Sequence, residues 1–267
     1  MNLLGARLYQ AVTFAADPLS GNPAFVLAGT QGASDIALTG ACDSLRADVL
    51  AVLDEMENEQ PLLRFFTPQG RHPGAGHATM AAAHVFLASH HREDVTFRLT
   101  DGGSRKARRD GDMIAVEFPL MPFVKTDLAG VVEAAVGATP LETSVAPFGH
   151  VAVFKDEATI AGLAPDLDRV SALDRSALIA TAPGSNGADV VIRVFAPKVG
   201  LPEDPVCGTA HRIIIPYWAR KMGKAKLHSR HLSPRGGDLW CEAKGEIVTI
   251  AGKNLLVVDG TIKLSTR

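Results

Sequence analysis

Cysteine is scarce in this chain of 267 residues. The three cysteines, Cys42, Cys207 and Cys241, are odd in number, and no two of them stand in a Cys-x-x-Cys spacing. A disulfide framework needs paired cysteines, and structural zinc sites usually take them in closely spaced pairs. The sequence therefore argues against a disulfide framework and a zinc site, and it predicts a protein of a reducing compartment, the cytoplasm.

The sequence also has little net charge and no long apolar runs. The formal net charge is -2, so no overall charge imbalance points to nucleic acid or to a membrane surface. No apolar run reaches the length of a membrane span, and residues 1–17 lack the basic and apolar stretches of a signal peptide. The basic run at 105–109 lies between two Asp-Gly turns, which predicts a solvent-exposed hairpin arm.

The chain contains an internal repeat. Residues 63–68 read Leu-Arg-Phe-Phe-Thr-Pro and residues 192–197 read Ile-Arg-Val-Phe-Ala-Pro, each typical of a strand that ends at a proline. A second match, 73–79 with 205–211, and a weaker third match, 21–27 with 149–154, occur in the same order. Three matches at nearly one spacing predict two similar halves, 1–120 and 121–267, with the crossover at 120–123.

Each half is predicted to hold one buried helix. The first, from Gly76 to Ser89, is rich in alanine and nearly free of charge. The second, from Gly208 to Met222, is rich in isoleucine and contains Pro216, which should kink it. Helices that are apolar on most sides are buried, so we expect each half to be a sheet around its helix.

The two helix starts predict an anion site. A helix that begins at a glycine turn exposes free N–H groups and the positive end of its dipole. Such ends at Gly76 and Gly208 are expected to face each other across a cleft between the halves and to hold a small carboxylate. His77, Asp204 and Cys207 lie beside them and could supply an acid and a base for proton transfer.

Structural roles for the same side chains stay open from the residues alone. Asp204 could cap the second helix, Cys207 could be a small buried hydrophobe, and His77 could be a core histidine. The repeat favours the functional interpretation, because capping alone does not require the same motif twice. Three more side chains could either line the pocket or be structural: His150, His211 and Arg235.

Four motifs, in order along nearly the whole chain, carry a family resemblance. They are Ser-Gly-Asn-Pro-Ala at 20–24, Arg-Phe-Phe-Thr-Pro at 64–68 leading to Gly-His-Ala-Thr at 76–79, Glu-Asp-Pro-Val-Cys-Gly-Thr-Ala-His at 203–211, and Ser-Pro-Arg-Gly-Gly-Asp-Leu at 233–239. Pro-Tyr-Trp-Ala at 216–219 adds to them. The chain resembles the phenazine biosynthesis-like (PhzF-like) family, which is grouped with diaminopimelate epimerase and proline racemase.

This resemblance implies an α+β fold of two pseudo-symmetric halves, each a curled, mostly antiparallel sheet around a central helix, with a final strand that can cross back. It implies a homodimer that needs no cofactor and no metal. The balanced charge and the short apolar runs, in turn, predict that the protein binds neither nucleic acid nor membrane. Members shift a proton within a small unsaturated amino acid. His77 and Asp204 match the family's assisting histidine and aspartate. The substrate-binding loop positions are matched by Gly76, Gly208 and Thr209.

The family's catalytic glutamate is missing from its usual place. Counting back from Arg64 puts Asp48, within an expected strand at 46–52, at that position. Aspartate is one methylene shorter, and it could act as the acid/base if burial raised its pKa. Alternatively, Glu55 or Glu57 contributes the carboxylate, or the carboxylate and the isomerase activity are both lost.

Cysteine chemistry gives a second alternative. Epimerases of the superfamily use one cysteine at each helix start, but the first position here is Ala75, so a two-thiol mechanism is excluded. Cys207 opposite Asp48 or His77 could still act if the helix N-terminus lowered its pKa. The hypotheses are thus an isomerase with Asp48 as acid/base, an epimerase or racemase using Cys207, and a catalytically silent protein that binds small carboxylates.

Overall fold

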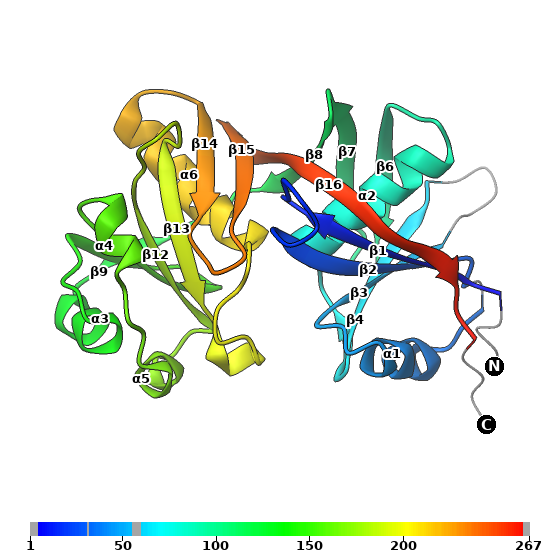
Figure 1. Ribbon diagram of the computed structural model, residues 1–267, viewed down its shortest axis with the longest axis horizontal. Helices are drawn as coiled ribbons and strands as arrows, with labels where there is room; N and C mark the ends of the chain where they lie inside the picture. Colours follow the sequence, from blue (N-terminus) through cyan, green and yellow to red (C-terminus); the bar gives the residue numbers. More distant parts are fainter. Residues whose placement is uncertain (1–4, 31, 55–59, 264–267) are drawn as a thin grey trace. The chain divides into compact units, whose positions relative to one another are not determined.

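The computed structural model describes residues 5–30, 32–54 and 60–263. The backbone contacts divide the chain into two units. The first consists of Met1–Glu117 together with Ala251–Arg267, and the second is Phe118–Ile250. Each unit has its own run of strands and its own helices, and the strands are numbered within one 16-stranded sheet (Figure 1). No helix in the described ranges combines the length and apolar character of a membrane span.

The sheet of the first unit has the strand order β1-β2-β3-β4-β6-β7-β8, and β5 pairs with β4. Its strands are β1 (Arg7–Thr13), β2 (Asn22–Ala28), β3 (Leu50–Asp54), β4 (Leu62–Thr67), β5 (Gly70–His72), β6 (Asp94–Leu99), β7 (Ser104–Asp110) and β8 (Met113–Pro119). The pairs β2–β3 and β4–β6 are parallel, and the other pairs are antiparallel. The basic run forms β7 in a hairpin with β6, which confirms the prediction of a hairpin arm.

The second unit repeats this arrangement. Its sheet has the order β15-β14-β13-β12-β11-β10-β9, with β11–β12 and β13–β14 parallel. The strands are β9 (Val124–Thr126), β10 (Glu142–Val145), β11 (Gly149–Val153), β12 (Ala177–Pro183), β13 (Val190–Phe195), β14 (Lys226–His231) and β15 (Gly237–Lys244). Strand β16 (Ile247–Thr261) begins in the second unit, continues into the first from Ala251, and pairs antiparallel with β1 (Figure 1).

Equivalent strands carry the sequence matches. The first match forms β4 and β13, and the third forms β2 and β11. In the first unit, β2 pairs parallel with β3, β3 pairs antiparallel with β4, and the chain then passes through α2 to β6, which pairs parallel with β4. In the second unit, β11, β12 and β13 pair in the same way, and the chain passes through a long helix to β14, which pairs parallel with β13. The fold is α+β with mixed, mostly antiparallel sheets, as predicted.

Helices cover both faces of the first sheet. Helix α1 (Asp35–Ser44) is capped by Ser34, whose hydroxyl accepts from the Ala37 amide, and it packs with Leu50 and Val52 in one apolar cluster. Because side chains alternate along a strand, Ala51 and Leu53 point to the opposite face. They are also buried, and α2 (Gly76–Ser89) packs against β1, β2 and β3. The bounds of α2 are those predicted from the sequence.

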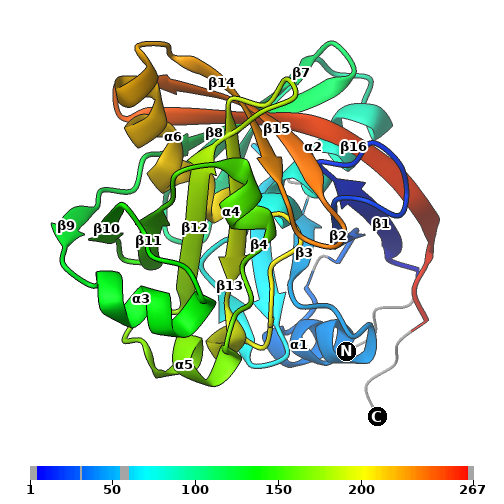
Figure 2. The same cartoon turned by 60° about the vertical axis from the view of Figure 1, so that its left-hand side comes forward.

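The second sheet is also covered on both faces, as the strands and helices in Figure 2 illustrate. Leu178 and Ala180 of β12 join an apolar cluster with α3 (Ala129–Val136), α4 (Glu157–Ala161) and α5 (Leu167–Ala172). Thr181, which points to the other face, accepts a hydrogen bond from the Trp218 indole N–H at 3.0 Å. Trp218 belongs to α6 (Gly208–Met222), which follows the short 3-10 helix η1 (Pro197–Val199) and has the predicted bounds.

Pro216 lies inside α6. A proline has no N–H, so the carbonyl four residues earlier loses its helical donor. That carbonyl belongs to Arg212, and it instead accepts a hydrogen bond of 3.0 Å from the Met121 amide. The proline therefore ties the segment 120–123 to the side of the helix. Gly223, in the left-handed conformation at φ 68°, ends the helix.

Candidate functional site

The start of α2 presents an uncapped helix end and a histidine without a partner. Ala75 precedes the helix and makes no capping bond, in contrast to Ser34 before α1. His77 is half-buried, and its imidazole has no hydrogen-bond partner among the residues that the structure describes. Burial, reinforced by nearby His72, lowers the pKa of His77 to about 4. The ring is therefore neutral at physiological pH and can both donate and accept a proton.

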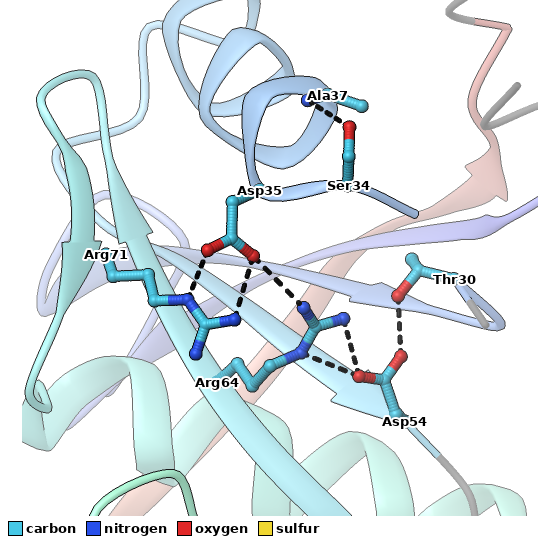
Figure 3. A network of polar contacts seen from close by, with 7 residues as sticks. All are labelled: Thr30, Ser34, Asp35, Ala37, Asp54, Arg64 and Arg71. Atoms are coloured by element: carbon cyan, nitrogen blue, oxygen red, sulfur yellow. Dashed lines mark hydrogen bonds and ion pairs between the residues drawn. The ribbon is translucent and has the colours of Figure 1, made fainter. Parts of the chain in front are cut away.

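A polar network fixes the strands that lead to α2 (Figure 3). Arg64 of β4 donates from Nε to Asp54 at 2.8 Å and pairs with it through Nη2 at 2.6 Å. The other oxygen of Asp54 accepts from the Thr30 hydroxyl at 2.6 Å. Asp35 at the start of α1 bridges Arg64, at 3.7 Å, and Arg71 of β5. The network joins β3, β4, β5 and α1, so the loop into α2 departs from a fixed hairpin.

Asp48 lies in a bend rather than in a strand. The sequence predicted a strand over 46–52, but β3 begins at Leu50. Arg46 adopts a left-handed conformation at φ 53°, which turns the chain after α1 and delays the strand. Asp48 is exposed and, within the described ranges, its carboxylate has no hydrogen-bond or ion-pair partner. The protein atoms around it raise its pKa. The alternatives Glu55 and Glu57 lie outside the described residues.

In the second unit, two histidines hold the peptide of Cys207 at the start of α6. The Cys207 N–H donates to Nε2 of His231 at 3.0 Å, and the Cys207 carbonyl accepts from Nδ1 of His211 at 2.8 Å. Nε2 of His211 lies 2.9 Å from the Ser229 hydroxyl. An imidazole that accepts through one nitrogen is neutral, and burial lowers the pKa of both rings, that of His211 to about 4. His211 is thus structural.

The lowered thiol pKa that a one-thiol mechanism requires is not found at Cys207. The helix start was expected to lower the thiol pKa, and the backbone amides of Ala210 and Thr209 do act in that direction. Burial and the nearby Asp204 carboxylate outweigh them, so the pKa of Cys207 is raised well above its ordinary value. Cys207 is a buried, protonated thiol rather than a thiolate.

Asp204 caps a turn rather than the helix. Its carboxylate accepts from the Val206 amide at 3.1 Å, while Cys207 occupies the N-cap position of α6. Its own amide donates to the Val194 carbonyl of β13 at 2.9 Å. The preceding residue, Glu203, forms a two-bond ion pair with Arg193 at 2.8 and 2.9 Å. Asp204 is therefore fixed by hydrogen bonds of its own carboxylate and amide and by the ion pair of the preceding residue.

For three residues, the sequence did not decide between a place in the lining of the pocket and a purely structural role. His150 is buried and pairs through Nε2 with Asp174 at 2.6 Å, and Nδ1 is without a partner within the described part of the chain. His211 supports Cys207, and Arg235 is half-buried. The described residues include no group of three or more His, Cys, Asp or Glu side chains placed to hold a metal ion.

Comparison with known proteins assigns the chain to a family. The family model for phenazine biosynthesis-like proteins (PhzC-PhzF) matches residues 11–260. This chain belongs to the phenazine biosynthesis-like family. An uncharacterized isomerase of Pseudomonas aeruginosa is 35% identical over 267 residues, covering 96% of this chain and 98% of that protein. This relative is named an isomerase, and its name gives no substrate.

Solved structures of the family and of a hydroxyproline epimerase share the fold. A PhzF family protein from Enterococcus faecalis has a TM-score of 0.90 at 30% identity, covering 99% of this chain and all of the other. A hydroxyproline epimerase from Agrobacterium vitis, solved with bound trans-4-hydroxy-L-proline, has a TM-score of 0.59 at 14% identity, covering 97% and 92%. That second likeness shows a common fold alone.

Sequence reasoning missed two supports of this family member's candidate site. The sequence showed Arg193 only as part of the internal repeat, in which Arg64 of β4 occupies the matching position. No pattern indicated that Glu203 forms an ion pair with Arg193. His231 lies two residues before the 233–239 motif, and nothing in the sequence signalled that it contacts Cys207. Both supports are contacts between segments distant in the chain.

We predict that this PhzF-like protein has no reactive thiol in its native state. The pKa of Cys207 is raised well above its ordinary value, and burial raises that of Cys42 to about 11 and also raises that of Cys241. All three are buried, so the thiolate fraction near pH 8 is small. Titration with a thiol reagent should find no fast-reacting thiol in the native protein and three after unfolding. Rapid alkylation of native Cys207 would contradict this prediction.

Acid should destabilise the fold through its neutral histidines. The pKa values of His77 and His211 are about 4 in the folded state, against 6.5 for an unperturbed histidine, and that of His231 is also lowered. As the pH falls from about 6.5 to 4, the unfolded state binds these protons first, so the free energy of unfolding decreases. Urea titrations at several pH values measure the slope.

The variant His77→Asn should flatten this pH dependence, because one histidine no longer takes up a proton on unfolding. The matched control is His91→Asn, an exposed residue at φ 50° where asparagine fits the backbone. An equal slope in the His77→Asn variant and the wild type would show that His77 is not kept neutral by the fold.

Proposed function

We propose that this protein is an isomerase that moves a proton within a small carboxylate-bearing metabolite, an amino acid or an unsaturated acid, by cofactor-independent acid/base chemistry. The observation that carries the proposal is that two polar side chains make no hydrogen bonds to the described residues. Within the described residues, Asp48 and His77 have no hydrogen-bond partners, whereas Asp35 and Asp54 are tied to arginines. The unpaired groups are free for a substrate. The expected homodimer and cytoplasmic location belong to the same proposal.

Asp48 acts as the acid/base in this proposal. Its carboxylate takes the proton from a C–H bond, and the electron pair of that bond enters the conjugated system beside the substrate carboxylate. The proton then returns to another carbon, so Asp48 ends ionised as it began. A raised pKa brings the carboxyl group closer to the working pH, which favours both steps. His77 and Asp204 orient the substrate or shuttle protons.

The helix starts bind the negative charge in this proposal. The amide of Gly76 opens α2, and those of Gly208 and Thr209 open α6, while neither helix has a side-chain cap. Backbone N–H groups at a helix N-terminus attract a carboxylate and the enolate that develops from it. This supports the three positions as substrate-binding residues.

An epimerase that uses Cys207 has less support. Proton abstraction by a thiol requires a thiolate, and burial together with Asp204 raises the pKa of Cys207. Ala75 also leaves the other helix start without a thiol. The single-thiol epimerase is therefore the second candidate, and the thiol titration above is its test.

The test combines ligand screening with isotope exchange. A panel of small amino acids, hydroxy acids and unsaturated carboxylic acids is screened by thermal shift, because a ligand at 100 times its Kd stabilises the native state by about 2.7 kcal/mol. Each hit is then incubated with the enzyme in deuterated water. Proton NMR should show one deuterium entering a carbon position and a shifted double bond.

Two results would reject this function. Stabilisation by a carboxylic acid without any exchange or turnover would indicate the silent binding protein. Exchange at one carbon with inversion of configuration and no movement of a double bond would indicate an epimerase or racemase.

A further inference from the structure

The second unit contains a cavity of about 620 Å³ at the C-terminal end of α6. One wall is the segment 120–123, and the other is formed by Pro216, Tyr217, Arg220 and Lys221. Ligand sites for small molecules usually have volumes between about 300 and 1,000 Å³. Thr209 and Arg220 are eleven residues apart on one helix, about 16 Å at 1.5 Å per residue, so this cavity is separate from the helix start.

The wall at 120–123 is held in place by backbone bonds. The Leu120 amide donates to the Glu246 carbonyl at 2.8 Å, and the Met121 amide donates to the Arg212 carbonyl that Pro216 leaves free. The Arg212 guanidinium donates to the Pro119 carbonyl at 2.8 Å. The cavity is thus preformed rather than dependent on a mobile loop, which reduces the entropy lost when a ligand binds.

The cavity has an apolar, aromatic side. Phe123 and Tyr217 meet edge to face, with ring centroids 6.1 Å apart, and Leu120, Pro122 and Pro216 extend this surface. Phe123 and Tyr217 are only half-buried, so part of each ring is open to a ligand. A planar aromatic or unsaturated body would pack against such rings.

The cavity lining also carries a surplus of positive charge. Three cations, Lys125, Arg220 and Lys221, line the cavity with one carboxylate, Glu142, which leaves two positive charges in excess. Glu142 is already satisfied, since it accepts from the Tyr217 hydroxyl and from Lys221, both at 2.9 Å. Lys221 also donates to the Tyr217 hydroxyl at 2.6 Å. Within the described residues, Arg220 forms no ion pair, so its guanidinium is free to bind an anion.

We propose that this cavity is a second small-molecule site, which binds an organic carboxylate with an aromatic or unsaturated body. Arg220 pairs with the carboxylate through its planar guanidinium, and Lys125 adds charge at the rim. The rings of Phe123 and Tyr217 take the body. Glu142 and Lys221 hold Tyr217 in position. The site does not depend on Asp48, His77 or the helix starts, so it stands apart from the proposed isomerase function.

The binding experiment uses Trp218 as a local reporter. Its ring lies 5.1 Å from that of Tyr217, and the other tryptophan, Trp240, is removed by Trp240→Phe. The probe is benzoate at pH 7, with benzamide as the uncharged match and acetate as the charge without a ring. Benzoate should change the Trp218 emission saturably. Benzamide, which lacks the charge-assisted contact, and acetate, which lacks the buried ring, should each bind at least about tenfold more weakly than benzoate.

Variants locate the probe. Arg220→Gln should weaken benzoate binding at least about tenfold, whereas Arg175→Gln, an exposed arginine of the same unit outside the cavity, should leave it unchanged. Both replace exposed side chains, and a thermal melt verifies that each variant folds. Phe123→Leu should weaken benzoate more than acetate.

Three outcomes overturn the proposal. They are the absence of saturable benzoate binding, equal affinity for benzamide, and benzoate binding that survives Arg220→Gln. If sedimentation shows that Arg220→Gln changes the association state while benzoate never binds, the cavity wall is a contact between copies of the chain, which also rejects a small-molecule site.

Discussion

Asp48→Asn is expected to lower the rate of proton exchange between substrate and solvent by about 10²- to 10⁴-fold, the usual contribution of one general acid/base. Asparagine keeps the size of the side chain and removes its ability to carry a proton. The measurement is deuterium incorporation by NMR with a substrate found in the ligand screen. Because thermal shift with the same ligand reports binding separately, a loss of chemistry is distinguishable from a loss of affinity.

The same variant should be as stable as the wild type or more stable. The protein atoms around Asp48 partly desolvate its exposed carboxylate and raise its pKa in the folded state, so its ionised form is disfavoured there at neutral pH. Within the described residues, no partner compensates for this effect. Such a group stabilises the fold only below its unfolded pKa and loses that contribution as the pH rises. A urea titration at pH 7 tests this sign.

Asp43→Asn is the matched control for Asp48. Asp43 lies in α1, five residues earlier, and is also exposed. Its replacement should leave both exchange and stability unchanged. Undiminished exchange in the Asp48→Asn enzyme would remove Asp48 from the mechanism, and an equal loss in both variants would point to a nonspecific effect on this segment.

Arg193→Met is expected to lower the free energy of unfolding by about 3 kcal/mol, because it leaves the Glu203 carboxylate without its partner in a mostly buried place. The side chains of Arg193 and Glu203 are only 12% and 16% exposed. Arg193 also donates to the Leu163 carbonyl at 2.9 Å, and its guanidinium lies 4.9 Å from the centre of the Phe195 ring. Turnover should fall as well, since Asp204 is the next residue after Glu203.

Two further variants sharpen this test. Arg169→Met removes an exposed ion pair with Asp166 and should cost less than about 1 kcal/mol. Adding Glu203→Gln to Arg193→Met should recover part of the lost stability, because the uncompensated charge is then gone. If Arg193→Met and Arg169→Met cost the same, the buried pair does not hold this loop.

The sequence predicted the long helices well because their signals are local. A glycine turn followed by a mostly apolar stretch marks the start of α2 at Gly76 and of α6 at Gly208, and both helices have the predicted bounds. The strand at 46–52 was placed too early, because nothing in the residues shows that Arg46 adopts a left-handed conformation. The short helices α3, α4 and α5 carry no signal long enough to have been predicted.

For the candidate site, the sequence identified groups but not their ionisation. His77, Asp204 and Cys207 stand out by their motifs, yet the thiol pKa of Cys207 depends on how deeply the fold buries it. The effect of the helix dipole on Cys207 could be read from the chain, whereas burial of Cys207 was only one of the alternatives that the sequence left open. The pairs Arg193–Glu203 and Cys207–His231 join residues on different elements, and such contacts follow only from the assembled fold.

The path of β16 has a consequence for how the protein is made. Residues 251–261 belong to the first unit, and 254–261 pair with β1, although all of the second unit is encoded between them and residue 117. During translation, the first unit therefore cannot complete its sheet until about 130 further residues have been synthesised. At typical bacterial and eukaryotic rates of translation, this takes roughly 7–26 seconds. Until then, the edge of β1 is unpaired and open to pairing with other nascent chains. A stop codon before residue 251 would thus damage the part of the protein that is synthesised first.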